Sequence, residues 1–495
     1  MKDLCDNGLR KNPSMRYKMD FKYCMTLKVT GVFLFFVIFI TTGYVAMRIW
    51  TTDSFERFIL QRLKVINGTR IYDIWKQPDA YSLAYVYPFN YTNIDRLNKG
   101  EKLKVEELGP YVFEERMHKE NVVFQSDKLV TYNENMTHQF RPELSKGSLN
   151  DSIITPDVIV LAAISKNIGN VFNTGALRLM LTTAKASPFK SYSAKDLIFG
   201  SDKDRLSSTM RILSRLLNNE DIPKFGVLAQ RTGFSVNRIT VGTGVDDIDN
   251  FALIHEVNGM KKLNVWSSDE CNNLTGFDGS IFPGRVSATK DTLHVFSYSL
   301  CRRIPLRFAK ETIVGMYPAR RFVLPPDVYA SGADNPENSC FCQVNCPPSG
   351  AFSIKPCNYD APLVISYPHF LYGDPELINH IDGLHPIKEK HEFYVDIHAT
   401  LGLTLSSNSR FQIGVVIPDA PDYFILKPFS PGLVLPIAWV DIKIGQVGRE
   451  MSDLLYEGTF TASSMKLTFG ISATLAALFS MLAICLICLK GLSYN

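Results

Sequence analysis

Two uncharged apolar segments lie near the ends of this chain of 495 residues and constrain everything between them. Residues 29–47 read VTGVFLFFVIFITTGYVAM and residues 467–489 read LTFGISATLAALFSMLAICLICL, without an Asp, Glu, Lys or Arg in either. Each is long enough to cross the roughly 30 Å hydrocarbon layer of a bilayer as a helix. We therefore predict transmembrane helices over 29–49 and 467–489, with both ends of the chain on the same side of a membrane.

The charges before the first segment indicate which side that is. Residues 1–28 contain seven Lys or Arg residues against three Asp residues, and an excess of basic residues marks the cytosolic side of a span. The segment is longer than the apolar core of a signal peptide, and no small-x-small cleavage site follows it closely, so we interpret it as an uncleaved anchor. We expect cytosolic tails over 1–28 and 490–495, and one extracellular or lumenal domain over 50–466.

Six of the ten cysteines lie in the region 271–357, between the two apolar segments. Four of them fall in the eighteen residues CFCQVNCPPSGAFSIKPC that begin at Cys340, and Cys271 and Cys301 precede them. Cysteines this dense outside the cytosol predict disulfides. We expect Cys340 and Cys342 to bond elsewhere than to each other, one of them reaching back to Cys271 or Cys301. Zinc is the alternative, but the cluster lacks a second pair of ligands at finger spacing.

Two further patterns agree with this topology. Sequons of the form Asn-x-Ser/Thr, the acceptors of N-linked glycans, all lie between the apolar segments, at Asn67, Asn90, Asn135, Asn150 and Asn273. The remaining cysteines fall in or near the predicted cytosolic face, where thiols stay reduced. Cys24, Cys485 and Cys488 are candidates for palmitoylation, and plain packing against lipid is the alternative for the last two.

Short aromatic and β-branched runs with turn residues between them predict antiparallel strands on both sides of a helical insert. Strand-like runs cover 81–92, 108–126, 129–140, 234–244, 251–260, 294–301, 362–373, 392–405, 410–417 and 432–444. Helical patterns cover 158–181 and 205–217 within the insert (155–218), and 447–456 before the second apolar segment. The predicted fold class is therefore α+β, an antiparallel β-barrel that can hold a ligand.

The first turns of the helix predicted over 158–181 are apolar on nearly every side. Such a helix either packs between other elements or exposes an apolar patch. Scattered basic residues accompany it; such lysines are usually only solvated, and the alternative is that they bind an anionic ligand. The candidate ligand contacts in the insert are Lys166, Lys185, Lys190, Ile164 and Ile168.

Catalytic, metal-binding and nucleic-acid-binding motifs are missing from the sequence. It contains no GxSxG, HExxH or GxxxxGK pattern, and the pair that begins at His255 is followed by Gly259 where a zincin has its second histidine. His391 and His398 are seven residues apart in a strand-like run, so we expect them to face opposite sides. A net charge of +4 does not favour nucleic acid as a partner. We predict no enzyme, no catalytic residue, no metal and no cofactor.

Five long motifs are spread over the region between the apolar segments. They are KLKVEELGPYVFEE (102–115), CNNLTGFDGSIFP (271–283), RFVLPPDVYASGADNPENSCFC (321–342), VISYPHFLYGDP (364–375) and HIDGLHPIKEKHEFYVDIHATLGLTL (380–405). These motifs resemble those of the scavenger receptor class B family. Its members include platelet glycoprotein IV (a fatty acid translocase), a lysosomal integral membrane protein and insect sensory neuron membrane proteins.

The resemblance implies a β-barrel with a helical bundle at its apex and a hydrophobic tunnel that leads toward the bilayer. It implies the disulfides Cys271–Cys340, Cys301–Cys357 and Cys342–Cys346. It also places Lys185 at a basic apex position that binds anionic lipoprotein ligands. Two family lysines differ here: the companion of Lys185 is Thr183, and the lysine that serves a fatty-acid head group in the translocase is Asn358. These differences bear on fatty-acid and oxidised-lipoprotein specificity.

The resemblance further implies a cell-surface receptor that binds lipids, lipoproteins or other anionic particles and transfers apolar cargo through its tunnel to the membrane. Its partners would be lipids of the fatty acid, sterol, carotenoid or lipoprotein class, the membrane, and a second copy of the chain in a homodimer through the apex. We expect a plasma-membrane location, with an endosomal or lysosomal membrane as the alternative. A phagocytic or adhesion receptor is an alternative within the family. A two-span ligand-gated ion channel is the alternative outside it, although the second segment offers only Ser472, Thr474 and Ser480 as a polar lining.

Overall fold

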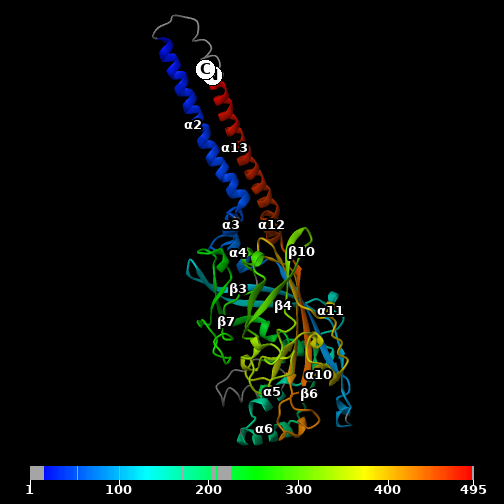
Figure 1. The fold of residues 1–495 in the computed structure, drawn as a ribbon. Helices are drawn as coiled ribbons and strands as arrows, with labels where there is room; N and C mark the ends of the chain where they lie inside the picture. Colours follow the sequence, from blue (N-terminus) through cyan, green and yellow to red (C-terminus); the bar gives the residue numbers. More distant parts are fainter. Residues whose placement is uncertain are drawn as a thin grey trace. The chain divides into compact units, whose positions relative to one another are not determined.

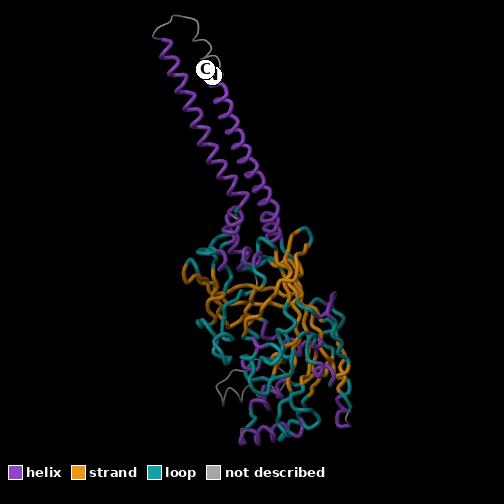
Figure 2. The backbone as a smooth tube through the Cα atoms, viewed as in Figure 1, coloured by secondary structure: helices purple, strands orange, loops and turns teal. Residues whose placement is uncertain are grey.

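The computed structural model describes residues 16–52, 54–99, 101–169, 171–201, 208–209, 224–279 and 281–492. The chain divides into two compact units, one formed by its two ends (Met1–Arg62 with Leu454–Asn495) and one formed by Leu63–Asp453 (Figures 1 and 2). The helix predicted over 205–217 lies almost entirely outside the described residues, as does the first part of the N-terminal tail.

Two long helices form the unit built from the chain ends. Helix α2 spans Arg16–Thr51 and helix α13 spans Ala462–Leu492, so each contains one of the predicted apolar segments. The indole Nε1 of Trp50 donates to Thr474 Oγ1 at 3.2 Å. A Cβ on Gly470 would lie 2.5 Å from the same indole, so the missing side chain lets the two helices pack here. Both helices contain stretches long and apolar enough to cross a membrane.

A continuous path of antiparallel strands builds the main sheet of the second unit (Figure 2). In spatial order the strands are β8 (Ile254–Val257), β7 (Gly233–Gly242), β4 (Leu129–Phe140), β3 (Tyr111–Ser126), β1 (Tyr81–Tyr91), β17 (Val434–Gln446), β16 (Thr404–Val416), β15 (Tyr394–His398), β11 (Tyr317–Val323), β10 (Arg302–Val314) and β9 (Thr292–Ser297). Branching from this path are β2 (Leu103–Glu107), β12 (Phe352–Ser353), β13 (Leu363–Ser366) and β14 (Ile381–Asp382).

The two ends of this path meet at Phe277, which nearly closes the sheet into a barrel. Phe277 forms bridges with Leu253 beside β8 and with Val295 on β9. Its backbone N–H donates to the His294 carbonyl at 2.8 Å, and the Phe296 N–H donates to its carbonyl at 3.1 Å. Closure leaves few unpaired strand edges, which is the usual solution for a long antiparallel sheet. The predicted antiparallel β-barrel is confirmed.

The helical insert gathers at one end of the barrel unit (Figure 1). It contains β5 (Ser152–Pro156), α5 (Val158–Lys166), α6 (Val171–Thr183), β6 (Phe189–Ser193) and α7 (Ala194–Phe199), with β5 and β6 paired in a sheet of their own. Helix α5 begins where the Asp157 carboxylate accepts from two backbone N–H groups of the first turn. The prediction of one continuous helix over 158–181 is wrong, because α5 ends at Lys166 and Gly169 adopts a φ of +84°.

Two strand predictions are also corrected. The run predicted as one strand over 392–405 contains all of β15, a turn and the start of β16. The imidazole Nδ1 of His398 holds that turn by accepting from the N–H groups of Thr400 and Leu401 at 3.1 Å. His391 belongs to the short helix α11 (Lys388–His391), so it does not share a strand with His398. The hairpin of β10 and β11 was not predicted at all.

Short helices complete the two units. They are α3 (Ser54–Leu60), α4 (Arg70–Lys76), α9 (Gly284–Thr289), α10 (Pro375–Asn379) and α12 (Arg449–Tyr456), with 3-10 turns that include η2 (Gln61–Leu63) and η9 (Pro368–Phe370). Helix α4 lies at the end of the barrel opposite to α5 and α6 (Figure 1). It starts at Thr69, whose hydroxyl accepts from the Tyr72 N–H, and it buries Ile74 and Trp75 toward the barrel interior.

Candidate functional site

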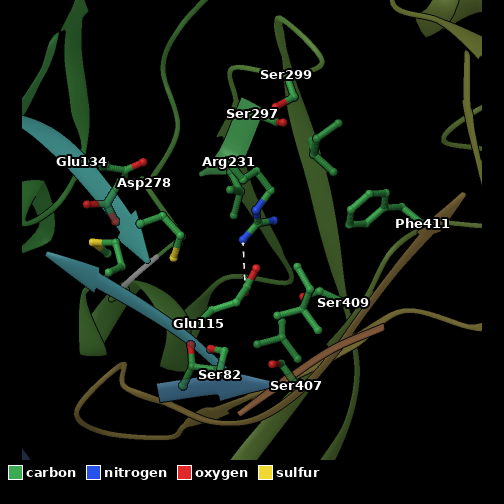
Figure 3. Close-up of a pocket in the computed structure, with 18 of the residues that line it drawn as sticks. Ser82, Glu115, Glu134, Arg231, Asp278, Ser297, Ser299, Ser407, Ser409 and Phe411 are labelled. Atoms are coloured by element: carbon green, nitrogen blue, oxygen red, sulfur yellow. Dashed lines mark ion pairs between the residues drawn. The ribbon is translucent and has the colours of Figure 1, made fainter. Parts of the chain in front are cut away.

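A cavity of about 660 Å³ lies inside the barrel (Figure 3). Side chains alternate between the two faces of a strand, so every second residue faces inward. On β3 the cavity is lined by Glu115, Met117 and Lys119, and on β16 by Ser407 and Ser409 among others. Binding pockets for small molecules usually measure roughly 300–1,000 Å³, so the volume suits a lipid-sized ligand.

Eight branched aliphatic side chains line the cavity. We call them the apolar wall, and they are Ile304, Leu306, Leu363, Ile365, Val395, Ile413, Ile442 and Ile444. These residues come from β10, β13, β15, β16 and β17, where branched aliphatic side chains favour strand geometry. Such a surface gains free energy when it covers a hydrocarbon chain instead of water.

Polar side chains also line the cavity. We call them the polar wall, and they are Ser82, Glu115, Glu134, Asp278, Ser297, Ser299, Ser407 and Ser409. Figure 3 shows these side chains around the guanidinium of Arg231, which reaches toward Glu115. A cavity lined by both kinds of side chain can take a molecule that has apolar and polar parts.

Glu115 is a buried carboxylate that is held in its ionised form. His138 Nε2 lies 2.9 Å from its Oε1, and Arg231 lies 3.6 Å from its Oε2. Burial works to raise the pKa of Glu115, but the charge of Arg231 and the hydrogen bond from His138 outweigh it, and the pKa is lowered. Glu115 therefore contributes a negative charge to the polar wall.

Lys119 and two acidic residues form the second charged group of the cavity. Lys119 is only 2% exposed, donates to the Trp75 carbonyl at 3.1 Å, and lies over the rings of Trp75 and Tyr132. The Tyr132 hydroxyl donates to Asp278 Oδ2 at 2.8 Å. Burial lowers the pKa of Lys119 against the charges of Asp278 and Glu134. Burial also raises the pKa of Glu134, with Lys119 opposing this and Asp278 adding to it.

Asn358, where the resemblance expects a lysine, also lines the cavity. It is 4% exposed, and its amide is fully engaged. Its Nδ2 donates to the Ile354 carbonyl at 3.0 Å and to the Ser299 carbonyl at 3.3 Å, while its Oδ1 accepts from Gln230 at 3.0 Å. This position therefore offers a ligand no positive charge.

A buried histidine cluster lies beside the barrel, away from the residues that line the cavity. His369 Nε2 lies 2.6 Å from Glu107 Oε2, and Trp439 Nε1 donates to the same oxygen at 2.8 Å. His391 stacks on His369 with ring centroids 4.5 Å apart. Among the residues that the structure describes, no group of three or more His, Cys, Asp or Glu side chains is placed to hold a metal ion.

The candidate ligand contacts of the insert fall in different environments. Lys185 is exposed just after α6, with a φ of +49°, and Lys166 and Lys190 are partly buried. Ile168 is 50% exposed. Ile164 is fully buried, so the expectation that it contacts a ligand at the surface is corrected: this side of α5 packs into the core.

The structure joins the six cysteines of the region 271–357 in the pairs that the resemblance implies. The Cα–Cα distances are 6.4 Å for Cys271–Cys340, 6.1 Å for Cys301–Cys357 and 5.7 Å for Cys342–Cys346. These distances lie within the usual range for a disulfide. On α13, Cys485 and Cys488 are free and exposed, whereas the side chain of Cys24 lies outside the description.

The five sequons differ in accessibility. Asn67 and Asn150 are exposed, while Asn90, Asn135 and Asn273 are partly buried. The Oδ1 of Asn90 accepts from the Ile154 N–H at 2.9 Å, and the Nδ2 of Asn135 donates to Glu120 at 2.7 Å. Glycosylation at all five remains a prediction, with the exposed pair the best placed.

The sequence reasoning did not identify the polar wall. Asp278 lies in one of the five family-like motifs, and Glu115 ends another, but neither was singled out. The sequence does contain a signal, because several ionisable residues lie within strand-like runs of an otherwise apolar barrel. Such residues indicate a polar site inside the barrel, but only once it is known which face of each strand points inward.

Comparisons with known proteins identify the family. The sequence matches the model of the CD36 family over residues 31–489. Scavenger receptor class B member 1 of Bos taurus is 28% identical over 421 residues, which is 84% of this chain and 80% of that protein. Lysosome membrane protein 2 of Homo sapiens is 30% identical over 371 residues, which is 74% of this chain and 76% of that protein.

These matches confirm the resemblance that the sequence motifs suggested. Together with two helices long and apolar enough to cross a membrane, they identify a membrane protein, as predicted. The chain belongs to the CD36 family.

Proposed function

We propose that this protein is a membrane receptor of the class B scavenger type that takes a lipid into the barrel cavity and passes it to the membrane. The observation that carries the proposal is the cavity of about 660 Å³, which eight branched aliphatic side chains help to line. Relatives named as scavenger receptors of class B support the receptor role. The natural cargo is a lipid of the fatty acid, sterol or carotenoid class, delivered free or from a lipoprotein.

The energetics of such a relay are favourable. A chain of sixteen carbons gains about 10 kcal/mol or more on leaving water, at about 0.8 kcal/mol per CH₂ group. A bilayer offers a similar gain, so cargo can leave an apolar cavity for a membrane without a large uphill step. The polar wall lowers the affinity for a pure hydrocarbon, because its charged groups would lose contact with water.

The location and topology of the receptor follow from the membrane spans. We propose that Leu63–Asp453 lies outside the cytosol and that both termini lie inside it, since basic residues dominate the segment before the first span. The plasma membrane is the proposed site of action. A lysosomal membrane is the second candidate, because one group of relatives is named as lysosome membrane proteins.

A cavity-filling variant tests the proposal. Ser409 on β16 lines the cavity, so Ser409→Trp places an indole where a lipid chain would lie. We expect detergent-solubilised full-length protein to bind a fluorescent fatty acid, sterol or carotenoid, and the variant to bind at least about tenfold more weakly, a loss of about 1.4 kcal/mol.

The matched control is Val236→Trp, which adds the same side chain at a position of β7 that is 81% exposed and outside the cavity lining. It should bind as the parent protein does. Circular dichroism and thermal unfolding establish that both variants fold. Absence of binding by the parent protein, or an equal loss in both variants, would contradict the proposal.

A further inference from the structure

We infer that the tip of the hairpin formed by β10 and β11 inserts into the lipid bilayer that holds the two terminal helices, as a third attachment of the barrel unit to the membrane. The hairpin tip is the segment 313–318, IVGMYP. Its partner is the layer of the bilayer where head groups meet acyl chains. The inference requires no particular cargo, so it is independent of the proposed function.

The hairpin tip is apolar and exposed. Ile313 is 73% exposed and Met316 is 63% exposed, and the segment contains no charged residue. Gly315 and Met316 form the turn between the paired residues Val314 and Tyr317. The φ of +62° at Gly315 suits the first central position of a tight hairpin turn, so a defined turn presents the apolar side chains. An exposed apolar patch marks a surface for a protein or a membrane, and tyrosine is enriched where a membrane meets water.

The hairpin tip extends beyond the neighbouring strands. The ladder between β10 and β9 ends with Arg307 opposite Thr292, and the ladder between β11 and β15 begins with Ala319 opposite His398. Within the part of the chain that the structure describes, no third strand pairs with the tip. A ribbon of two strands is marginally stable in water, so an apolar surface that covers its end stabilises it.

The charged residues nearest in sequence lie behind the tip, along the two strands. Lys310 and Glu311 precede it on β10, and Arg320 and Arg321 follow it on β11. Arg320 pairs with Glu311 at 3.1 Å, and Arg321 pairs with Asp396 at 2.7 Å. The tip can therefore enter the interfacial layer without carrying a charge into it. Because both signs of charge flank the tip, a zwitterionic lipid is sufficient as the partner.

Strand register places the tip at the end of the barrel from which the chain leaves for both apolar helices. Four ladder pairs connect the hairpin to that end: Ala319 with His398, Ile397 with Thr404, Asn408 with Lys443, and Gln446 with Tyr81. The last pair joins the end of β17, which leads to α12 and α13, to the start of β1, which follows α2 and α4. Figure 1 shows the hairpin at the same end of the barrel unit as α4.

This position favours a bilayer as the partner over another protein. Both chain connections to the apolar helices start from the same end of the barrel, so a bilayer that contains α2 and α13 is tied to that end by the chain itself. A third contact there would restrict the tilt of the barrel unit against the membrane. Tyr81 and Met451 line the cavity at this end, so the contact would also keep that part of the cavity near lipid.

A fluorescent label on the hairpin tip tests the inference in the full-length protein. The cysteines outside the disulfides are first replaced by serine; they are Cys5, Cys24, Cys485 and Cys488. Met316→Cys is then labelled with the environment-sensitive dye NBD, and the protein is reconstituted into phosphatidylcholine nanodiscs. The same label in Leu179→Cys is the matched control, because Leu179 is also apolar, is 71% exposed and lies on α6 at the opposite end of the barrel unit.

We expect a lipid with a nitroxide near the head of its acyl chain to quench the label at 316 at least about threefold more strongly than the label at 179. Ile313→Asp should lower the lipid quenching at 316 by about twofold or more, because a carboxylate is disfavoured among acyl chains, whereas Ile313→Leu should leave it unchanged. Circular dichroism establishes that each variant folds.

Three results would overturn the inference while leaving lipid binding by the cavity untouched. Equal lipid quenching at 316 and 179, with aqueous iodide quenching both labels, would place the tip in water. A label at 316 that neither the nitroxide lipid nor iodide quenches would show that protein covers the tip. Lipid quenching at 316 that Ile313→Asp does not lower would show that the tip lies near the bilayer without inserting into it.

Discussion

Buried neutral histidines make single residues of this barrel sensitive to acid. His391 is 3% exposed, its Nδ1 accepts from the Ile387 N–H at 3.0 Å, and its ring stacks on His369. Burial, and then the charge of His369, lower the pKa of His391 to about 3. Burial alone lowers the pKa of His398 to about 4, and burial with a nearby arginine does the same for His294. Each stays neutral in the folded protein at a pH where the unfolded chain binds a proton.

These lowered pKa values determine whether the free energy of unfolding rises or falls with pH. The unfolded pKa of histidine is about 6.5, above the folded values, so the unfolded state takes up more protons below that pH. The contribution of these histidines to stability is complete above about pH 6.5 and falls as the pH drops toward 4. We expect a loss of about 1–2 kcal/mol per histidine between pH 7 and pH 5, measured by denaturant unfolding.

His391→Gln isolates one of these contributions. The variant should be less stable than the parent at pH 7, because it alters a packed cluster, yet should lose less stability between pH 7 and pH 5. His380→Gln is the control, since His380 is 49% exposed and forms only a long contact of 3.8 Å with Glu376. An unchanged loss in His391→Gln would show that this residue does not take up the proton.

The polar wall also shows that the sequence does not reveal which charged residues of a strand face the cavity. In the run EERMHKE, Glu115 and Lys119 face the cavity, while Arg116 and Glu120 are exposed on the other face. Charged residues occupy both faces, so the two-residue period of a strand does not indicate which of them are buried. The cluster becomes recognisable only when β3, β4 and the segment with Asp278 come together in three dimensions.

At the scale of elements, the sequence predicted most strands of the barrel but missed the hairpin of β10 and β11, which carries two buried arginines. The hairpin of β10 and β11 places the Arg302 guanidinium 4.1 Å from the Phe341 ring centre and that of Arg320 4.0 Å from the Phe308 ring centre. Arginine is usually exposed, so this run did not resemble a core strand. The break between α5 and α6 was missed because a single glycine, Gly169, costs only about 1 kcal/mol in a helix and is a weak signal.

The disulfides stabilise their elements to different degrees. Cys301–Cys357 joins residues 56 positions apart, whereas Cys342–Cys346 joins residues 4 positions apart. On the chain-entropy model the longer loop contributes about 4 kcal/mol to stability and the shorter loop about 2 kcal/mol. Replacing Cys301 and Cys357 together by alanine should therefore lower the free energy of unfolding by about 2 kcal/mol more than the same change at Cys342 and Cys346. Both double variants leave the other two bridges in place, so each serves as the control for the other, and equal losses would contradict the expectation.

For the whole molecule, the decisive question is on which side of the membrane the barrel unit lies. All five sequons fall within Leu63–Asp453, and so do the disulfides, whereas the free cysteines Cys485 and Cys488 lie on α13. Disulfides and N-linked glycans are both added outside the cytosol. One placement of the barrel unit therefore accounts for the pattern of charges, cysteines and sequons together, with both chain ends in the cytosol.

Glycan mapping tests this placement because the fold predicts which sequons are usable. Asn67 and Asn150 are exposed, so Asn67→Gln and Asn150→Gln should each lower the apparent mass of the protein made in animal cells by one glycan. Asn90 lies within β1 and accepts a backbone hydrogen bond from Ile154, so Asn90→Gln should affect folding more than it affects mass. Glycosidase treatment should reduce the parent protein and all three variants to the same mass. A parent protein whose mass is unchanged by the glycosidase would place the barrel unit in the cytosol, where a receptor for external lipid could not meet its cargo.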